Sequence, residues 1–226
     1  MQKKTKGLVI NYLKYKESSI IVKIFTRDLG LKSYIVNSVR SAKSKMGFYQ
    51  PLTLLDLVVY DKEKSALNRI SEVKLNYAFQ RIPFDFYRSG VAMFVGEVLG
   101  KSIYDNYTNE NLYDFLEEAI IYLDQQEANI QLYPISFLLE TSKFLGFGTS
   151  DSEELFEQLF GLVHDDDFAQ EEKKYLNELM KISFGSTVKI PAIYRRKILD
   201  DLLKFYQLHL DGFSELKSVK VLRSLH

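Results

Sequence analysis

The stretch "SIIVKIFTRDLGLKSYIV", residues 19–36, contains two short segments rich in β-branched and aromatic residues, one on each side of a turn. Residues 19–26 and 31–36 have the composition of β-strands, and "RDLG" between them has the polar residues and the glycine of a tight turn. This stretch therefore predicts an antiparallel hairpin.

Further predicted strands lie on both sides of this hairpin. "GLVINYLKY" (7–15) precedes it, and "LTLLDLVVY" (52–60) and "LNRISEVKLNY" (67–77) follow it. Five strands with no long helix between them fit a small closed barrel, and the oligonucleotide/oligosaccharide-binding barrel, the OB-fold, has this strand count and size. We expect an OB-fold domain in residues 1–80.

From residue 81 onward the apolar residues recur at the 3.6-residue period of α-helices instead of alternating. We therefore expect residues 81–226 to form an all-α helical domain, with the boundary near Arg81 to Pro83, and an α+β fold class for the chain. The predicted helices lie within residues 87–104, 111–123, 134–148, 152–160, 171–182 and 191–210.

The charges are divided unevenly between these two parts. The chain has 30 basic and 30 acidic residues, so its formal net charge is zero. Residues 1–80 hold 15 lysines and arginines against 6 acids, whereas residues 81–226 hold 15 against 24. Such an asymmetry indicates an anion-binding module joined to a second domain.

The strongest local excess of positive charge lies in "NSVRSAKSKMG", residues 37–47. Arg40, Lys43 and Lys45 stand here among small residues, and no acid occurs between residues 29 and 55. Phosphate binding needs cations held together on one surface so that condensed counterions are released. We therefore predict that this loop binds the backbone of a nucleic acid.

Other residues extend the predicted binding surface. Phe48 and Tyr49, at the end of the loop, are candidates for stacking on bases. For Tyr34, inside a predicted strand, packing in the core fits equally well. Cations expected to add to the surface are Lys23, Arg27 and Lys32 on the hairpin, and Lys3, Lys4 and Lys6 in a flexible basic leader.

The residues that catalysis or metal binding would need are sparse. The chain has no cysteine, which excludes disulfides and thiolate-bound zinc, and its three histidines have no metal-binding spacing. No phosphate-binding glycine loop or nucleophile elbow is present. No apolar run is long enough to cross a bilayer, and the amino terminus does not resemble a signal peptide, so we expect a cytoplasmic protein without membrane contact.

Of two groups of neighbouring acids, one leaves an alternative function open. "HDDDF" (164–168) would be the centre of a metal-dependent nuclease at Asp165 to Asp167, although a solvated turn before the next helix is the interpretation that we favour. Asp200 and Asp201 are adjacent on a predicted helix, so their side chains diverge, and we expect them to form a polar face.

The helix predicted in residues 134–148 carries a stripe of apolar residues with a lysine beside it. Leu138, Thr141 and Phe144 belong to this stripe and Lys143 accompanies it. From the spacing alone, packing between helices is the favoured interpretation. The alternative is a groove for a short hydrophobic peptide whose acidic end meets Lys143.

Several of these motifs, in this order and spacing, resemble the RecO family of bacterial recombination mediator proteins. Thr26 and Gly30 match the T-x-x-x-G hairpin of that family. Gly146-Phe147 resembles a Leu-Gly-Tyr ending, and Leu216 to Ser218 resembles a closing Leu-Lys-Ser segment. The residues that match its basic loop and the Gln-Pro after it are Arg40, Lys43, Ser44, Gln50 and Pro51.

The resemblance implies an amino-terminal OB-fold and a helical domain in a protein that is not an enzyme. It implies binding of single- and double-stranded DNA and annealing of complementary strands in DNA repair and homologous recombination. It also implies cooperation with RecR, and in many species RecF, so that RecA replaces the single-stranded-DNA-binding protein on DNA. These roles imply association with the nucleoid in the cytoplasm.

One departure from the family concerns metal. Many relatives carry four cysteines in a zinc-binding insertion after the Leu-Gly-Tyr position, and "GFGTSDSEELFEQLFGLVHDDDF" (146–168) has none. We therefore expect neither zinc nor another cofactor. Either packing of the apolar residues in 155–160 replaces the metal or the insertion is reduced.

The family's functional surfaces are carried over to matching positions of this chain. Its basic DNA-binding surface corresponds to Arg40, Lys43 and Lys45, with Arg27, Lys32 and Lys23 beside them. Its contact with the acidic tail of the single-stranded-DNA-binding protein is assigned to Leu138, Thr141, Lys143 and Phe144. The other class that remains is a general nucleic-acid-binding or scaffold protein, such as an RNA-binding barrel without a role in recombination.

Overall fold

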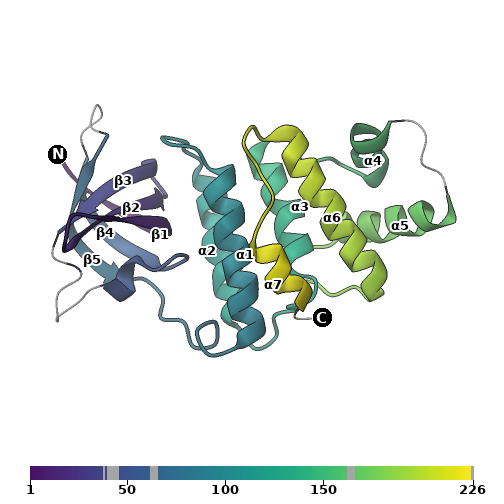
Figure 1. Ribbon diagram of the computed structural model, residues 1–226, viewed down its shortest axis with the longest axis horizontal. Helices are drawn as coiled ribbons and strands as arrows, with labels where there is room; N and C mark the ends of the chain where they lie inside the picture. Colours follow the sequence, from purple (N-terminus) through teal and green to yellow (C-terminus); the bar gives the residue numbers. More distant parts are fainter. Residues whose placement is uncertain (38, 40–45, 62–65, 162–165, 225–226) are drawn as a thin grey trace.

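The computed structural model describes residues 1–37, 39, 46–61, 66–161 and 166–224. A closed β-barrel and a larger helical part lie side by side along the longest axis of the molecule (Figure 1). The predicted fold class, a five-stranded OB-type barrel followed by an all-helical domain, is confirmed. The strands are β1 (Gln2–Tyr15), β2 (Ser19–Thr26), β3 (Gly30–Val36), β4 (Leu54–Tyr60) and β5 (Asn68–Leu75).

The barrel closes because its first strand is long enough to pair on both sides. β1 pairs antiparallel with β4 through its first half and with β2 through its second half, so that Leu8 lies opposite both Leu54 and Phe25. The register shifts between Val9 and Asn11, as expected where a bulge bends a strand from one partner to the next. A short parallel pairing of β3 with β5 completes the strand order β1-β2-β3-β5-β4.

The interior of the barrel is filled by apolar side chains from every strand or its flanks. Tyr34, which is 1% exposed, points into this interior, so core packing is its role. Tyr49 belongs to a short 3₁₀ helix, η1 (Met46–Tyr49), and its ring also fills the barrel. The buried residues of this cluster are Val9, Ile20, Val22, Ile24, Tyr34, Val39, Tyr49, Leu55, Leu57 and Val59.

The prediction that Lys3, Lys4 and Lys6 form a flexible basic leader is wrong, because all three lie within strand β1. Lys3 lies opposite Val59 and Lys6 opposite Asp56 in the pairing of β1 with β4. Lys3 also forms an ion pair of 2.7 Å with Asp61. Pairing with β4 makes residues 2–8 part of a strand, which their polar sequence did not indicate.

The helical part contains seven helices within the described residues, and polar caps set several of their starts. Asp85, Asn109, Asp151 and Asp166 each accept a backbone N–H of the first turn at the start of their helix. The helices are α1 (Phe86–Ser102), α2 (Glu110–Asp124), α3 (Tyr133–Leu145), α4 (Ser152–Phe160), α5 (Asp167–Lys181), α6 (Ala192–His209) and α7 (Ser218–Ser224). No helix in the described segments has both the length and the apolar character needed to cross a membrane.

The last of these helices, α7, was absent from the prediction. It packs beside α1, and the carboxylate of Glu97 in α1 caps its start. Glu97 accepts the N–H groups of Lys217 at 3.0 Å and Ser218 at 2.9 Å, and the Ser218 hydroxyl at 2.7 Å. The cap comes from a helix about 120 residues earlier in the sequence, so a local pattern does not reveal it.

One apolar core runs through the contact between barrel and helices. Phe25 and Leu31, on the outer face of the β2–β3 hairpin, belong to the same cluster of buried residues as the interior of the helical part. The Phe25 ring lies against Tyr107 and Tyr113, with centroid distances of 6.3 and 6.1 Å. The two parts of the chain are therefore packed together as one body.

The connection between β5 and α1 is fixed by one buried carboxylate, that of Asp124 at the end of α2. It accepts the backbone N–H groups of Gln80 at 2.7 Å, and of Arg81 and Ile82 at 2.8 Å each. Burial disfavours the charged form, but these three hydrogen bonds and one from the Tyr77 hydroxyl outweigh it and lower the pKa of Asp124. The connection therefore has a defined course along the ends of α1 and α2.

Candidate nucleic-acid interface

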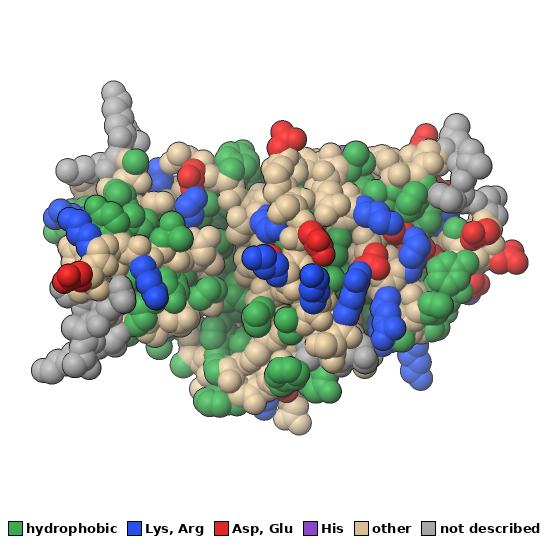
Figure 2. All heavy atoms as spheres, in the orientation of Figure 1, with side chains coloured by type: hydrophobic (Ala, Val, Ile, Leu, Met, Phe, Trp, Pro, Cys, Tyr) green, Lys and Arg blue, Asp and Glu red, His purple; other side chains and the backbone are tan. Residues whose placement is uncertain are grey.

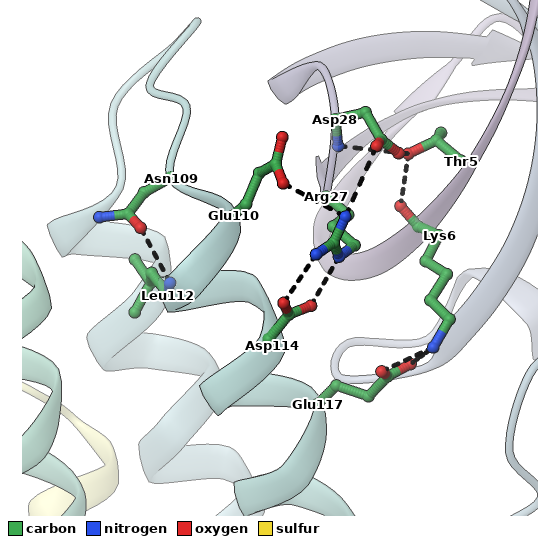
Figure 3. A network of polar contacts seen from close by, with 9 residues as sticks. All are labelled: Thr5, Lys6, Arg27, Asp28, Asn109, Glu110, Leu112, Asp114 and Glu117. Carbon is green, nitrogen blue, oxygen red and sulfur yellow. Dashed lines mark hydrogen bonds and ion pairs between the residues drawn. The ribbon is translucent and has the colours of Figure 1, made fainter.

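The cations of the β2–β3 hairpin point toward the helical part and not toward open solvent. Arg27, at the turn, donates from Nε and Nη2 to the two carboxylate oxygens of Asp114 at 2.7 and 2.9 Å (Figure 3). Its Nη1 lies 3.2 Å from Glu110 at the start of α2. This pairing raises the pKa of Arg27 and lowers the pKa of Asp114, so both groups are held in their charged forms.

Three further lysines of the barrel have partners in the helical part. Lys6 donates to both oxygens of Glu117 at 2.8 and 3.0 Å, as Figure 3 shows. Lys23 forms an ion pair of 2.8 Å with Asp105, and Lys32 donates to the side-chain oxygen of Asn106 at 3.0 Å. Acids of the helical part thus neutralise Lys6, Lys23 and Arg27, which the sequence interpretation had treated as free cations.

The Thr26-x-x-x-Gly30 motif shapes the same contact. The Thr26 hydroxyl donates to the Gly30 carbonyl at 2.8 Å and accepts the Leu29 N–H at 3.1 Å, which closes the turn. Gly30 has a φ of 72°, a conformation that favours glycine. The next residue, Leu31, exchanges backbone hydrogen bonds of 3.0 Å with Tyr107 and Asn106, so the turn is bound to the connection between α1 and α2.

Arg40, Lys43 and Lys45 lie outside the described residues, whereas the structure describes the residues on either side of them. Val39 is buried in the barrel, and η1 begins at Met46. Tyr49, predicted to stack on bases, is 2% exposed and is therefore a core residue instead. Phe48 is half-buried and packs against the barrel core.

The described barrel keeps a second set of cations on its β1–β4–β5 side. An open groove there is lined by Lys4 and Lys74, and also by Lys6 and Arg27, which are already paired with acids of the helical part. The acids in its lining are Asp28, Asp56 and Glu72. Neither Lys4 nor Lys74 forms an ion pair with an acid in the described part of the chain. This side of the barrel can therefore add positive charge to an anion-binding surface, although its own acids limit the excess.

The stripe proposed as a peptide groove is part of the helical core. Leu138 and Thr141 are both 0% exposed, so they have no surface for a peptide to contact. Lys143 is exposed and pairs with Glu140 at 2.8 Å, and Phe144 stacks on Phe115 at a centroid distance of 5.2 Å. Packing between helices, the interpretation that the spacing favoured, describes this stripe.

A basic groove lies instead along α6 and α7. A row of lysine and arginine side chains crosses the helical part over these two helices (Figure 2). A hollow of about 310 Å³ here has an apolar floor that includes the buried residues Phe213, Leu216 and Val219. Lys204 and Lys220 line it together with two acids, Asp200 and Glu215. Further cations along these helices are Arg196, Lys197 and Arg223.

Some of the cations along α6 and α7 are free to meet a ligand. Arg196 and Lys220 form no ion pair with an acid in the described segments, whereas Arg223 pairs with Asp200 at 2.7 Å. An apolar floor with a basic edge suits a short peptide that carries both apolar and acidic side chains. The sequence interpretation missed this surface because the acidic total of residues 81–226 conceals a local cluster of cations.

A buried group of charges under α6 was also unexpected. Asp201 is 0% exposed and is bonded to Lys197 and Lys204, so it is not part of a polar face. Glu172 on α5 is 1% exposed, and its Oε2 lies 3.5 Å from Lys197, while its Oε1 has no hydrogen-bond partner among the residues that the structure describes. Burial raises the pKa of Glu172 to about 7, although Lys197 favours the ionised form.

The acidic segment "HDDDF" lies only partly within the described residues, which begin again at Asp166. The side chain of Asp166 accepts the Ala169 N–H at 2.8 Å and caps α5, and Asp167 lies in the first turn. His164 and Asp165 are outside the described residues. Within the described ranges no group of three or more histidine, cysteine, aspartate or glutamate residues is placed to hold a metal ion.

Comparisons with known proteins cover the whole chain. The family models described as "Recombination protein O N terminal" and "Recombination protein O C terminal" match residues 1–79 and 83–157. Proteins named DNA repair protein RecO from Flavobacterium johnsoniae and Flavobacterium psychrophilum are 38% and 37% identical to it, each over 100% of this chain and 99% of the relative. The RecO of Phocaeicola vulgatus is 33% identical over the same shares. The chain therefore belongs to the RecO family of DNA repair proteins.

Proposed function

We propose that this protein acts in DNA repair and homologous recombination by binding single- and double-stranded DNA and annealing complementary strands, without catalytic turnover. In this role it helps RecA to replace the single-stranded-DNA-binding protein, together with RecR and, where present, RecF. The observation that carries the proposal is that a closed barrel of OB topology forms the amino-terminal part of a chain that matches DNA repair proteins from end to end.

The proposed mechanism is electrostatic. Arg40, Lys43 and Lys45 neutralise phosphates of the bound strand, which lowers the repulsion between two strands and lets base pairing proceed. Burial of Val39 and of Tyr49 in the barrel supports this assignment, because the chain is anchored on both sides of these cations. The pairing of Arg27 and Lys23 with acids of the helical part gives them a smaller share in phosphate binding than the loop.

A charge-matched comparison tests the DNA-binding surface. The variant with Arg40, Lys43 and Lys45 changed to alanine is compared with one in which Lys174, Lys181 and Lys189, exposed in the helical part, are changed to alanine. Fluorescence anisotropy at several salt concentrations gives the slope of log K against log salt. The slope should fall by about 0.7 to 0.9 for each phosphate that the first variant no longer neutralises, and it should stay unchanged in the second. An equal effect of both variants, or none from the first, contradicts the proposal.

Annealing and partner dependence are tested with complementary strands coated by the cognate single-stranded-DNA-binding protein. We expect the wild-type protein to anneal them and the loop variant to do so more slowly. The same reaction with RNA strands separates this function from that of a general RNA-binding or scaffold protein. Incubation of labelled DNA with magnesium or manganese tests the remaining alternative, a nuclease centred on Asp165 to Asp167, and we expect no cleavage.

The groove along α6 and α7 is the proposed binding site for the acidic, hydrophobic tail of the single-stranded-DNA-binding protein. This assignment is supported, over the buried stripe at Leu138, by the apolar floor of the groove and by Lys220, which pairs with no acid in the described part of the chain. Lys220→Glu should weaken binding of a fluorescent tail peptide at least tenfold, whereas Lys174→Glu on α5 should not change it. Equal binding by the two variants would remove this groove from the proposal.

A further inference from the structure

We propose that three exposed aromatic side chains at the start of α1, those of Phe84, Phe86 and Tyr87, form a stacking platform for unpaired bases of single-stranded DNA. This inference rests on the proposed function and adds a binding site to it. It also predicts which form of DNA the site selects, because the bases of a duplex are already stacked on each other.

The exposure of these rings is the first observation. Phe84 is 85% exposed, Phe86 71% and Tyr87 52%. The rings of Phe86 and Tyr87 contact each other edge to face at a centroid distance of 6.2 Å. Hydrophobic side chains gather at the lower edge of the molecule over the start of α1 in Figure 2. A cluster of large apolar side chains at the surface indicates a binding site more than a folding requirement.

The backbone beneath the rings is held rigidly, which is the second observation. Asp124 accepts the N–H groups of Gln80, Arg81 and Ile82, and the Ser89 hydroxyl donates to the Ile82 carbonyl at 2.6 Å. The side chain of Asp85 caps α1. The rings are therefore presented by a defined turn and by the first turn of a helix, and a preformed platform loses little conformational entropy when a ligand binds.

The charges around the rings favour a polyanion. The Asp85 carboxylate is neutralised by Arg88, whose Nη1 lies 2.7 Å from it. Arg81 is exposed, and its guanidinium donates to the amide oxygen of Gln126 at 3.4 Å. Within the described ranges it forms no ion pair with an acid. Open ring faces beside an uncompensated guanidinium are the combination with which proteins bind single strands, by stacking on bases and by attracting phosphates.

The exposed face of α1 leads from the platform toward Pro51 and η1 of the barrel. Met93, which is 58% exposed, lies two turns after Phe86 on the same face of α1. One turn further, Gly96 faces Pro51, with 3.9 Å between the Pro51 Cβ and the position of a Cβ on Gly96. Only Gln50 separates Pro51 from η1, and in the sequence η1 comes directly after residues 40–45. The helix from Phe86 to Gly96 spans about 15 Å, a distance that a few nucleotides cover.

The experiment compares two double alanine variants that each remove two exposed apolar side chains. Phe84→Ala with Phe86→Ala changes the platform, and Ile193→Ala with Leu208→Ala changes α6, where these residues are 61% and 57% exposed. Anisotropy at one salt concentration gives the affinity for an oligothymidine and for a duplex of equal length. The platform variant should lose at least tenfold in affinity for the single strand and less than twofold for the duplex, and the α6 variant should match the wild-type protein.

Two further measurements isolate stacking. The salt slope of the platform variant should equal that of the wild-type protein, because no phosphate contact is removed. Oligonucleotides that contain 2-aminopurine should be quenched by the wild-type protein and by a Phe86→Trp variant, and not by the platform variant. Circular dichroism of each variant confirms that it is folded.

The outcomes separate this inference from the proposed function. Equal losses of single-strand and duplex affinity, or no loss at all, overturn the platform while leaving DNA binding intact. A wild-type protein that binds neither form of DNA overturns both proposals. Sedimentation that depends on concentration in the wild-type protein and not in the platform variant would show that a second copy of the chain covers the rings, and this result also overturns the inference.

Discussion

The carbonyl oxygen of Tyr107 lies so close to Gly30 that a Cβ atom on residue 30 would overlap it. Gly30 belongs to the barrel and Tyr107 to the helical part, so a single missing side chain allows their backbones to meet. The hydrogen bonds of Leu31 to Tyr107 and Asn106 depend on this close approach.

Gly30→Ala should lower the free energy of unfolding by about 2 kcal/mol or more, because the new Cβ meets a backbone oxygen and the residue has a positive φ. Gly47→Ala is the control, since no atom of the described residues beyond its chain neighbours lies within 4 Å of its Cβ position. Chemical denaturation measures both variants. Equal stabilities of the two would show that the Tyr107 connection moves aside without cost.

The ion pair between Arg27 and Asp114 should contribute to the contact between barrel and helices more than to DNA binding. Arg27→Ala should therefore reduce thermal stability and leave the salt slope of DNA binding close to that of the wild-type protein, because the guanidinium already faces carboxylates. In a double-mutant cycle, Asp114→Asn should lower the free energy of unfolding by less in the Arg27→Ala variant than in the wild-type protein. If Arg27→Ala instead lowers the salt slope as much as the loss of one cation from residues 40–45, Arg27 does bind phosphate.

The Asp124 carboxylate should make stability sensitive to acid. Its pKa is lowered in the folded protein, so its contribution is present above the pKa of the unfolded chain, about 3.9, and is lost as the pH falls through the lower folded value. Asp124→Ala leaves three backbone N–H groups without this acceptor and should cost about 3 kcal/mol at pH 7. Asp105→Ala, at an exposed site, is the comparison, and urea denaturation between pH 3 and 7 measures both.

Glu172 should have the opposite pH dependence. The folded protein keeps its proton up to a pKa of about 7, whereas the unfolded chain releases it near 4.5, so stability from this group falls as the pH rises between these values. Glu172→Gln should be more stable than the wild-type protein at pH 8 and nearly equal to it at pH 4.5. Glu171→Gln, at a more exposed position that pairs with Lys174, should show no such change. A constant difference between Glu172→Gln and the wild-type protein across this range would contradict the assignment.

The sequence was sufficient to predict the barrel and most helices, because β-branched runs and helical periodicity are local properties. The start of β1 was missed because "QKKTK" has no apolar alternation, and only pairing with β4 makes it a strand. Tyr49 was misassigned for a related reason, since an aromatic residue after a basic loop has the same local pattern whether its ring is buried or open.

The partners and the burial of the charged side chains were the least predictable feature. Arg27 and Asp114 are 87 residues apart, and Lys6 and Glu117 are 111 apart, so no spacing rule connects them. Asp201 and Asp200 have identical side chains, yet one is buried with two lysines and the other pairs at the surface with Arg223. A count of charges along the chain locates a basic segment but not the acids that face it in space.

The apolar core shared by the barrel and the helices limits which segments of this protein can be exchanged between related genes. A crossover between two related genes near codon 80 would join one ancestor's Phe25 and Gly30 to another's Tyr113 and Tyr107. The ring of Phe25 packs against Tyr113, and the backbone of Gly30 lies directly against Tyr107. The exchangeable unit is the hairpin together with the residues of α1 and α2 that receive it. Homologous barrels should transplant successfully only when these receiving residues travel with them.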